Sequence, residues 1–276
     1  MIINHNLMAM NAHRQLTGNN FAQGKSLEKL SSGYRVNRAG DDAAGLSISE
    51  KMRSQIRGLQ QASRNALDGI SLIQTAEGAL TETHAILQRM RELTVQAAND
   101  TNVTGDRDAI QAEIYSLACE IDRIGLATQF NERKLIDGTL STLHLQIGAN
   151  NESSCDMTVS ISAMDCATLT LDALNGDLDV ANNTNALATL DGITAAIKTV
   201  SAQRSALGAL QNRLEHTINN IDNAAENLQA AESRIRDVDM AKEMMTYTKN
   251  NILIQASTAM LAQANMAPQG VLQLLR

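Results

Sequence analysis

The sequence has almost no proline and very few aromatic residues. Its 276 residues include one proline, Pro268, together with two phenylalanines, three tyrosines and no tryptophan. Because proline interrupts helix interiors, no residue before Pro268 breaks a helix in this way. Because globular cores usually rely on aromatic side chains, an apolar content of Leu, Ile, Ala, Val and Met indicates long helices packed side by side.

Signals for secretion and for membrane insertion are also missing. Residues 1–7 read MIINHNL, with no basic start and no apolar run, so they do not resemble a cleavable secretory signal peptide. No stretch is long and apolar enough to span a membrane. Composition alone therefore predicts a soluble, cytoplasmic protein without membrane insertion, and export would need a route that reads no cleavable signal.

The cysteines do not form a disulfide framework, because three residues without paired spacing cannot close one. Cys119 lies on a helical pattern and is predicted to be a small core residue. Cys155 and Cys166 flank a predicted strand, whose ends would lie roughly 30 Å apart at about 3.3 Å per residue. A bridge needs Cα atoms within about 7 Å, so no disulfide is expected between them.

The net charge of −7 is unevenly distributed. No Lys or Arg occurs between Leu135 and Ile197, and the acids from Asn150 to Gly192 predict an exposed, solubilising middle segment. The stretch from Lys25 to Arg64 is rich in basic residues, but acids interrupt it and aromatic partners are missing. Nucleic acid is therefore not an expected partner.

Arrangements for catalysis are also missing. A zinc peptidase needs two His at i and i+4 with an intervening Glu, whereas the histidines here are scattered. The adjacent Asp41 and Asp42 indicate a helix cap beside a glycine turn more readily than an acid–base pair. The glycines form no phosphate loop with an adjacent Lys. We therefore expect no enzymatic activity, no metal and no cofactor.

Helical periodicity dominates both halves of the chain. In the C-terminal half, one series of residues follows alternating steps of four and three: Ile193, Ile197, Val200, Arg204, Leu207, Gln211, Leu214, Ile218, Ile221, Ala225 and Leu228. All of them except Arg204 and Gln211 are apolar. Such a seam is at least roughly 50 Å long and needs partner helices. Residues from Met52 to Ile73 keep the same alternation and predict a second helix. Asp41 or Asp42 is its expected N-cap, and Gly105 marks its end. A third helix is predicted from about Asp106 to Ile124.

The middle and the two ends have other patterns. Alternating residues at 142–147 and 157–162 predict a β-hairpin. Both chain ends are predicted to be helical, and the C-terminal one has two apolar stripes: Met240, Met244, Tyr247, Ile254 and Leu261, and Met245, Ile252, Ala256, Ala259 and Met266. A helix with two apolar stripes must be covered on two sides, which predicts cover by other subunits.

Several long motifs carry a family resemblance. Residues 30–46 read LSSGYRVNRAGDDAAGL, residues 74–80 QTAEGAL, 88–93 QRMREL, 129–131 QFN and 265–276 NMAPQGVLQLLR. The chain resembles bacterial flagellin over roughly residues 1–140 and 190–276. Met266, Ala267 and the three cysteines depart from the usual family pattern.

The resemblance implies a mainly α fold, a long coiled-coil-like bundle of N- and C-terminal segments with a small β-hairpin region. It implies an inner-tube domain of residues 1–40 and 240–276, a rod core of 41–140 and 190–239, and an exposed hairpin segment of 141–189. It further implies a secreted, extracellular subunit that polymerises into the flagellar filament for swimming. Assembly contacts are expected at Ile3, Leu7, Met10, Met244, Tyr247, Ile254 and Leu261.

The resemblance also implies partners. These are the chain itself, a flagellar export chaperone, the filament cap and hook–filament junction proteins. Arg89, Leu93 and Glu113 match the surface that Toll-like receptor 5 reads in some flagellins, and Arg89 and Leu93 are one helical turn apart. The alternatives are a hook–filament junction protein, which shares the helical plan, and an intracellular coiled-coil signalling protein, which would explain the seams but not the motifs at the two ends.

Overall fold

The computed structural model describes residues 6–139, 142–171 and 178–274, and within them the protein is mainly helical, as predicted. The helices are α1 (Leu7–Ser32), α2 (Ala43–Ala97), α3 (Thr104–Ala127), α4 (Asn183–Arg236) and α5 (Met240–Leu274). The chain divides into two compact units, unit 1 of Met1–Ser54 and Glu226–Arg276, and unit 2 of Gln55–Ala225. Their boundaries fall inside α2 and α4, and the inner-tube and rod division stays a prediction.

Short strands form two antiparallel pairs in the described part of unit 2. In the first, β1 (Gln129–Phe130) pairs with β2 (Arg133–Lys134) through a two-residue turn in which Asn131 and Glu132 have positive φ angles of 48° and 65°. In the second, β3 (Leu143–Gln146) pairs with β4 (Asp156–Val159), and Leu145 lies opposite Met157. The short helix η1 (Ser153–Cys155) precedes β4. The second pair confirms the predicted hairpin.

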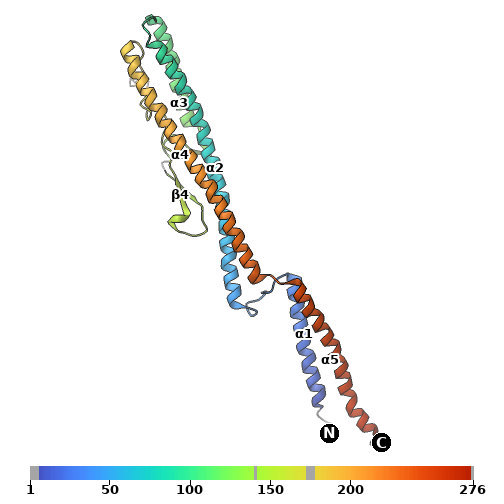
Figure 1. The fold of residues 1–276 in the computed structure, drawn as a ribbon. Coiled ribbons are helices and arrows are strands. Elements are labelled where there is room, and N and C mark those ends of the chain that lie inside the picture. Colours follow the sequence, from blue (N-terminus) through green and yellow to red (C-terminus); the bar gives the residue numbers. More distant parts are fainter. Residues whose placement is uncertain (1–5, 140–141, 172–177, 275–276) are drawn as a thin grey trace. The chain divides into compact units, whose positions relative to one another are not determined.

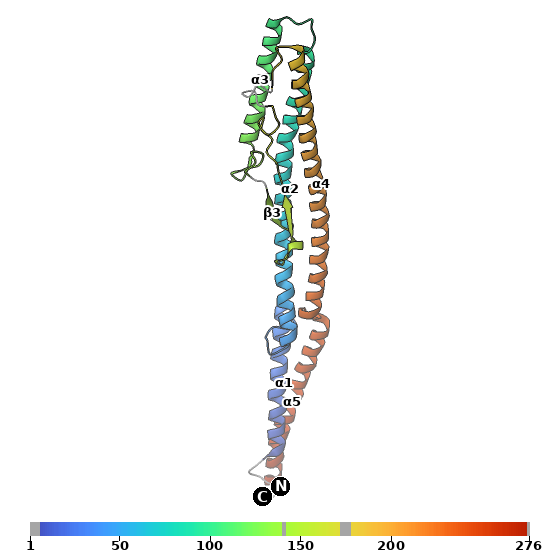
Figure 2. The ribbon, with the colours of Figure 1, turned by 90° about the vertical axis from the view of Figure 1, so that its left-hand side faces the viewer.

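The two predicted seams form the helical contact of unit 2, where α2 and α4 lie side by side and antiparallel (Figures 1 and 2). On α4 the seam alternates between buried and half-buried residues, and the buried ones are Ile193, Val200, Leu207, Leu214 and Ile221. The polar seam residues Arg204 and Gln211 are half-buried, and the Arg204 guanidinium lies 3.8 Å from the Glu77 carboxylate of α2. The two polar seam residues therefore lie at the edge of the helix contact and not in its buried centre.

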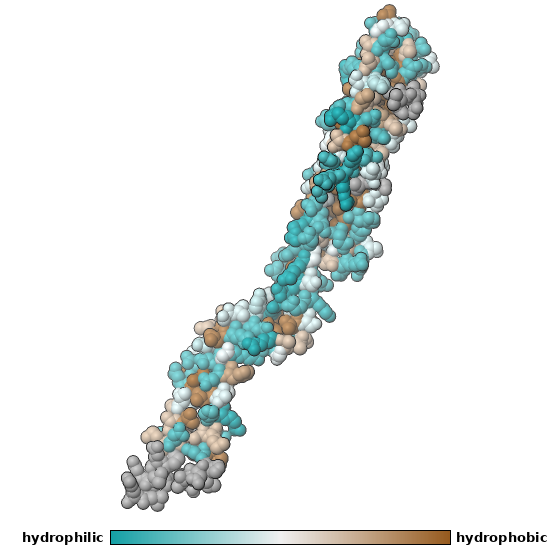
Figure 3. Space-filling model, turned by 180° about the vertical axis from the view of Figure 1, so that it is seen from behind, coloured by the Kyte–Doolittle hydropathy of each residue, from teal (hydrophilic) through white to brown (hydrophobic). Residues whose placement is uncertain are grey.

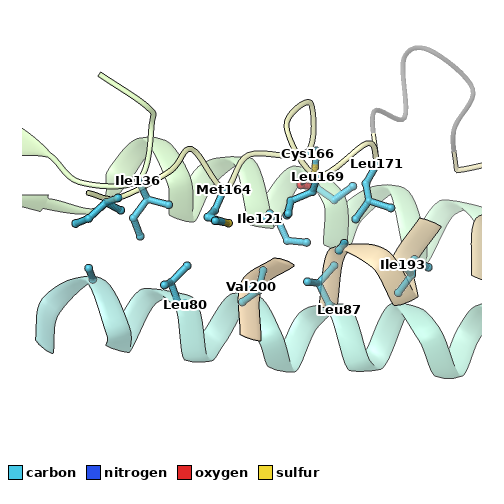
Figure 4. Close-up of a cluster of buried hydrophobic side chains, with 14 of the residues drawn as sticks. Leu80, Leu87, Ile121, Ile136, Met164, Cys166, Leu169, Leu171, Ile193 and Val200 are labelled. Carbon is cyan, nitrogen blue, oxygen red and sulfur yellow. Dashed lines mark hydrogen bonds between the residues drawn. The ribbon is translucent and has the colours of Figure 1, made fainter. Parts of the chain in front are cut away.

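The core of unit 2 also takes in the non-helical middle of the chain. Figure 4 shows Leu80 and Leu87 of α2 facing side chains of α3, of α4 and of the segment that follows β4. That segment buries Ile161, Met164, Cys166, Leu169 and Leu171, each at 3% exposure or less. The prediction that residues 141–189 are an exposed projection is therefore wrong for these five residues, which face the core, whereas Glu152 and Leu187 of the same range are exposed.

The cysteines are free and differ in burial. Cys119 is exposed on α3, so its prediction as a core residue is wrong. Cys166 takes that role instead: its thiol lies 3.2 Å from the Ala118 carbonyl oxygen, and burial raises its pKa to about 12. Cys155 is half-buried beside β4, and no bridge to Cys166 forms.

In unit 1, the motif at residues 30–46 builds the connection between α1 and α2. Gly33 ends α1 in the left-handed conformation (φ 75°), which glycine adopts without steric cost, and its N–H donates to the Lys29 carbonyl. The chain then crosses residues 236–238, where the Arg35 N–H donates to the Arg236 carbonyl at 2.7 Å and the Val238 N–H donates to the Gly33 carbonyl at 3.0 Å. A short antiparallel crossing therefore ties the two terminal segments together.

Charged side chains stabilise the same connection. Asp41 accepts hydrogen bonds from the Asn37 and Arg38 N–H groups and lies 2.7 Å from the Lys25 ammonium, and the hydrogen bond from Lys25 lowers the pKa of Asp41. Asp42 is the cap residue, because its carboxylate accepts from the Gly45 N–H at 2.8 Å in the first turn of α2. The predicted cap is confirmed, and the two aspartates have separate structural roles.

Candidate assembly surface

The terminal helices α1 and α5 lie side by side along their length (Figures 1 and 2). Their contact contains small and polar groups: the Asn19 amide donates to the Ser257 hydroxyl at 3.0 Å, and the Asn6 amide donates to the Ala264 carbonyl at 2.7 Å. Small residues let the two backbones approach closely. Most of the larger apolar side chains of these helices lie on their other faces.

Those larger side chains are exposed. Phe21 is 76% exposed, Met8 74% and Met245 68%, and the others on α1 and α5 are Leu7, Met10, Leu27, Met240, Met244, Ile252, Leu253, Met260 and Met266. Val36 is the only buried hydrophobic residue among the described residues of unit 1. Figure 3 shows apolar residues at several places along this pair on the face drawn there. Exposed apolar patches of this extent are typical of protein interaction sites.

Two shallow grooves lie on this surface. One, of about 590 Å³, runs between α1 and α5 and is lined by Met8, Leu253, Ala256, Met260 and polar residues such as Asn11 and Gln15. The other, of about 510 Å³, lies on α5 and is lined by Met244, Met245, Thr248, Lys249, Ile252 and Leu253. Both grooves are mainly apolar, so a side chain from another molecule would be the natural occupant of each.

The predicted assembly residues separate into two groups. Leu7, Met10 and Met244 are exposed, whereas Tyr247, Ile254 and Leu261 are half-buried. Ile254 and Leu261 lie three or four residues from Ser257 on α5, and Tyr247 lies seven residues, or two helical turns, before Ile254. All three therefore share the face that contacts α1. Ile3 lies outside the described residues. Met8, Phe21 and Met260 were not among the predicted assembly residues, and the structure shows that they are exposed on the same two helices.

The predicted receptor-binding residues also differ in exposure. The Arg89 guanidinium lies 2.9 Å from the Glu113 carboxylate and 3.3 Å from that of Glu92, and the hydrogen bond to Glu113 raises the pKa of Arg89. This pair links α2 to α3 at the surface. Leu93, by contrast, is 3% exposed and belongs to the core cluster. Its placement on one surface with Arg89 is therefore wrong.

Two further features bear on function. Among the described residues, no three His, Cys, Asp or Glu side chains gather closely enough to hold a metal ion. No helix in that same part of the chain is both long and apolar enough to cross a membrane. The exposed apolar faces of α1 and α5 are therefore the surface feature that most needs an explanation.

Two family models match the two ends of the chain. The model of the bacterial flagellin N-terminal helical region matches residues 3–141, and that of the bacterial flagellin C-terminal helical region matches residues 190–275. The chain belongs to the bacterial flagellin family. The matched ranges include every described residue of α1, α2, α3 and α5, so the family identity covers both the terminal pair and the seams of unit 2.

Curated relatives extend this identity over the full chain. This flagellin is 62% identical over 280 residues to a flagellin of Halalkalibacterium halodurans and 54% identical over 306 residues to a flagellin of Bacillus subtilis. It is 51% identical over 289 residues to the flagellar filament 33 kDa core protein of Treponema phagedenis. Each comparison covers 100% of this chain and 100% of the relative.

Solved structures agree with the family. The crystal structure of Bacillus cereus flagellin is 32% identical to this flagellin and matches 61% of this chain and 94% of that chain with a TM-score of 0.50. A hook-associated flagellar protein from Vibrio parahaemolyticus matches 71% of this chain and 100% of that chain with a TM-score of 0.61, but at 13% identity it shows the fold alone. This flagellin is a structural subunit of the bacterial flagellar filament, and nothing in these comparisons favours the hook–filament junction protein.

Proposed function

We propose that this flagellin makes its main filament contacts through the outer apolar faces of α1 and α5, with Leu7, Met10 and Met244 among the contact residues. The observation that supports this is the exposure of most large apolar side chains of the terminal pair. Burying one such side chain fully contributes about 1.5–3 kcal/mol. Neighbouring subunits would supply the missing cover, and head-to-tail contacts that do not close would extend into a filament.

The half-buried residues Tyr247, Ile254 and Leu261 have a different role in this proposal. They hold α5 against α1 within one subunit, and this pairing presents the outer faces in a defined arrangement. Since the pair has so little core of its own, it is expected to be the least stable part of the free subunit. Assembly would then stabilise the helices as well as join the subunits.

Hydrogen exchange tests this assignment. Amides of residues 6–40 and 240–266 are expected to exchange fast in the free subunit and slowly in the filament, because cover by other subunits suppresses local opening. Amides of α2 and α4 beside the buried core should be protected in both states and provide the internal control. Equal protection of the terminal helices in the two states would contradict the proposal.

We also propose that the apolar faces of α1 and α5 bind the other partners that the family resemblance implies. An export chaperone would cover them before assembly, and the filament cap and the hook–filament junction proteins would meet them at the two ends of the filament. Secretion to an extracellular flagellum belongs to the same proposal. What supports these partners is the uncovered apolar surface, which would promote aggregation in a subunit left unprotected.

Recognition by Toll-like receptor 5 is a separate proposal and now involves only Arg89 and Glu113. Both are exposed and form an ion pair across α2 and α3, so a receptor could contact them without opening the core. Glu113→Ala is expected to lower receptor activation by the unassembled subunit about tenfold, as the loss of one good charged contact would. The measurement is a dose–response curve in receptor-expressing reporter cells.

A matched variant controls this experiment. Arg123→Ala removes an exposed ion pair of the same kind on α3, where the Arg123 guanidinium contacts Glu120. It should leave receptor activation unchanged. If Glu113→Ala and Arg89→Ala activate the receptor as well as Arg123→Ala does, the proposed recognition site is not used.

A further inference from the structure

The methionines of this flagellin differ sharply in exposure between the two units. On α1 and α5, Met8 is 74% exposed, Met245 68%, Met260 64% and Met244 50%. In unit 2, Met164 is 2% exposed, Met157 is 5% exposed and Met90 is fully buried. The same oxidisable side chain is thus open to solvent in one unit and shielded in the other.

The four exposed methionines named above line the two grooves of the assembly surface. Met8 and Met260 come from opposite helices and line the groove between α1 and α5, and Met244 and Met245 line the groove on α5. A thioether in such a place is apolar and adaptable, which suits a contact with another subunit. It is also the side chain whose polarity an oxidant can change without breaking the backbone.

We propose that Met8, Met244, Met245 and Met260 form a reversible oxidation site, at which peroxides convert the assembly surface of the unassembled subunit from apolar to polar and block its polymerisation. This inference rests on the proposed function of the α1 and α5 faces. The substrates are oxygen-atom donors such as hydrogen peroxide. Once covered by other subunits, the same sulfurs would be shielded, so the site would act before assembly.

The chemical step is an oxygen transfer to sulfur. A lone pair of the thioether sulfur attacks one oxygen of hydrogen peroxide, the S–O bond forms and the O–O bond breaks. The proton on the transferred oxygen passes to the departing hydroxide, which leaves as water. The sulfur is oxidised to the sulfoxide and the peroxide is reduced. Thiol-dependent sulfoxide reductases reverse the change, forming a disulfide and water.

The sulfoxide acts against assembly because it is polar and must lose its hydration at a subunit contact. Burying an unsatisfied polar group is unfavourable, so one sulfoxide is expected to raise the critical concentration for polymerisation about tenfold. Several sulfoxides on the same surface would prevent assembly at ordinary concentrations. The core of unit 2 would be unaffected, because its methionines are buried.

Peptide mapping with polymerisation measurements tests the proposal on the full chain. Free subunits and finished filaments are exposed to hydrogen peroxide, and sulfoxides are located by mass spectrometry. In free subunits the four methionines are expected to oxidise at least roughly tenfold faster than Met90, Met157 and Met164, in keeping with their exposure. Oxidised subunits should not polymerise and should recover after treatment with sulfoxide reductases of both stereospecificities. In filaments the four should be protected.

The control is a variant with Met→Leu at all four positions and at Met10, which is 63% exposed and is the other methionine of α1 among the proposed contact residues. The replacements keep the apolar volume and all three cysteines. The variant should polymerise and should continue to polymerise after peroxide treatment. Loss of its assembly after peroxide would place the sensitivity at other residues and overturn the proposal, as would normal polymerisation of wild-type subunits carrying the four sulfoxides.

A second variant distinguishes a failure of the oxidation proposal from a failure of the proposed assembly surface. Met→Gln at the same four positions makes them polar without any oxidant. If this variant polymerises normally, the grooves are not assembly contacts and the proposed function fails with the switch. If it fails to polymerise while peroxide has no effect on the wild type, the assembly surface stands and only the oxidation site is rejected.

Discussion

Met260→Asp is expected to abolish polymerisation of this flagellin while leaving the free subunit folded. Met260 is 64% exposed and lines the groove between α1 and α5, so a charge there stays solvated in the free subunit. In a subunit contact the same carboxylate would be buried without a partner, at a cost of several kcal/mol. The cost recurs at every subunit added. Sedimentation and electron microscopy of seeded assembly reactions measure the loss, and circular dichroism checks the fold.

Leu187→Asp is the matched control for this prediction. Leu187 is 50% exposed in the first turns of α4, where an acid interacts favourably with the helix N-terminus. It lies on α4 in unit 2 and belongs to neither α1 nor α5. We expect Leu187→Asp subunits to assemble like the wild type. Filament growth by Met260→Asp equal to that of the control would mean that the groove is not a subunit contact.

The second large effect is expected in the core of unit 2, where Leu87→Ala should destabilise the free subunit by about 2–5 kcal/mol. Leu87 is fully buried among side chains of α2, α4 and the middle segment (Figure 4). Removing its side chain loses the burial free energy and leaves a cavity that tightly packed neighbours cannot fill. Urea unfolding followed by circular dichroism should show a lower midpoint at an unchanged slope.

Leu67→Ala makes the same chemical change at an exposed position of the same helix. Leu67 is 52% exposed, so its replacement should alter the free energy of unfolding by no more than about 0.5 kcal/mol. The difference between the two variants isolates the contribution of burial from that of helix propensity. Equal destabilisation by both would show that the core does not hold the helices together in the way described.

The helical framework was predictable because its signals are local and repeated. The seam from Ile193 to Leu228 and its partner on α2 follow from periodicity alone, since apolar residues on one helix face must meet a partner. An N-cap at Asp41 or Asp42 and the hairpin of β3 and β4 were predictable for the same kind of reason, because cap chemistry and two-residue alternation act within a few residues. The turn at Asn131 and Glu132 gave no alternation long enough to detect.

The errors concern which face of an element is covered. Leu93 and Cys119 were assigned to the wrong environments because a helical pattern shows which residues share a face, but not what packs against it. Leu93 proved to face the core and Cys119 the solvent. The segment around Met164 and Leu171 was judged by its polar composition, yet its large apolar side chains are buried. Their partners lie far away in the sequence, on α2, α3 and α4.

The sequence by itself determined the long helices, their seams, the hairpin, a helix cap at Asp41 or Asp42 and the family, because these depend on local spacing and on extended motifs. Only the tertiary structure decided which apolar stripe of α5 is used within the subunit and which is left uncovered. The stripe with Tyr247, Ile254 and Leu261 packs against α1, since small and polar groups there permit close approach. The stripe with Met245, Ile252 and Met266 is exposed, and that choice depends on contacts between residues more than two hundred positions apart.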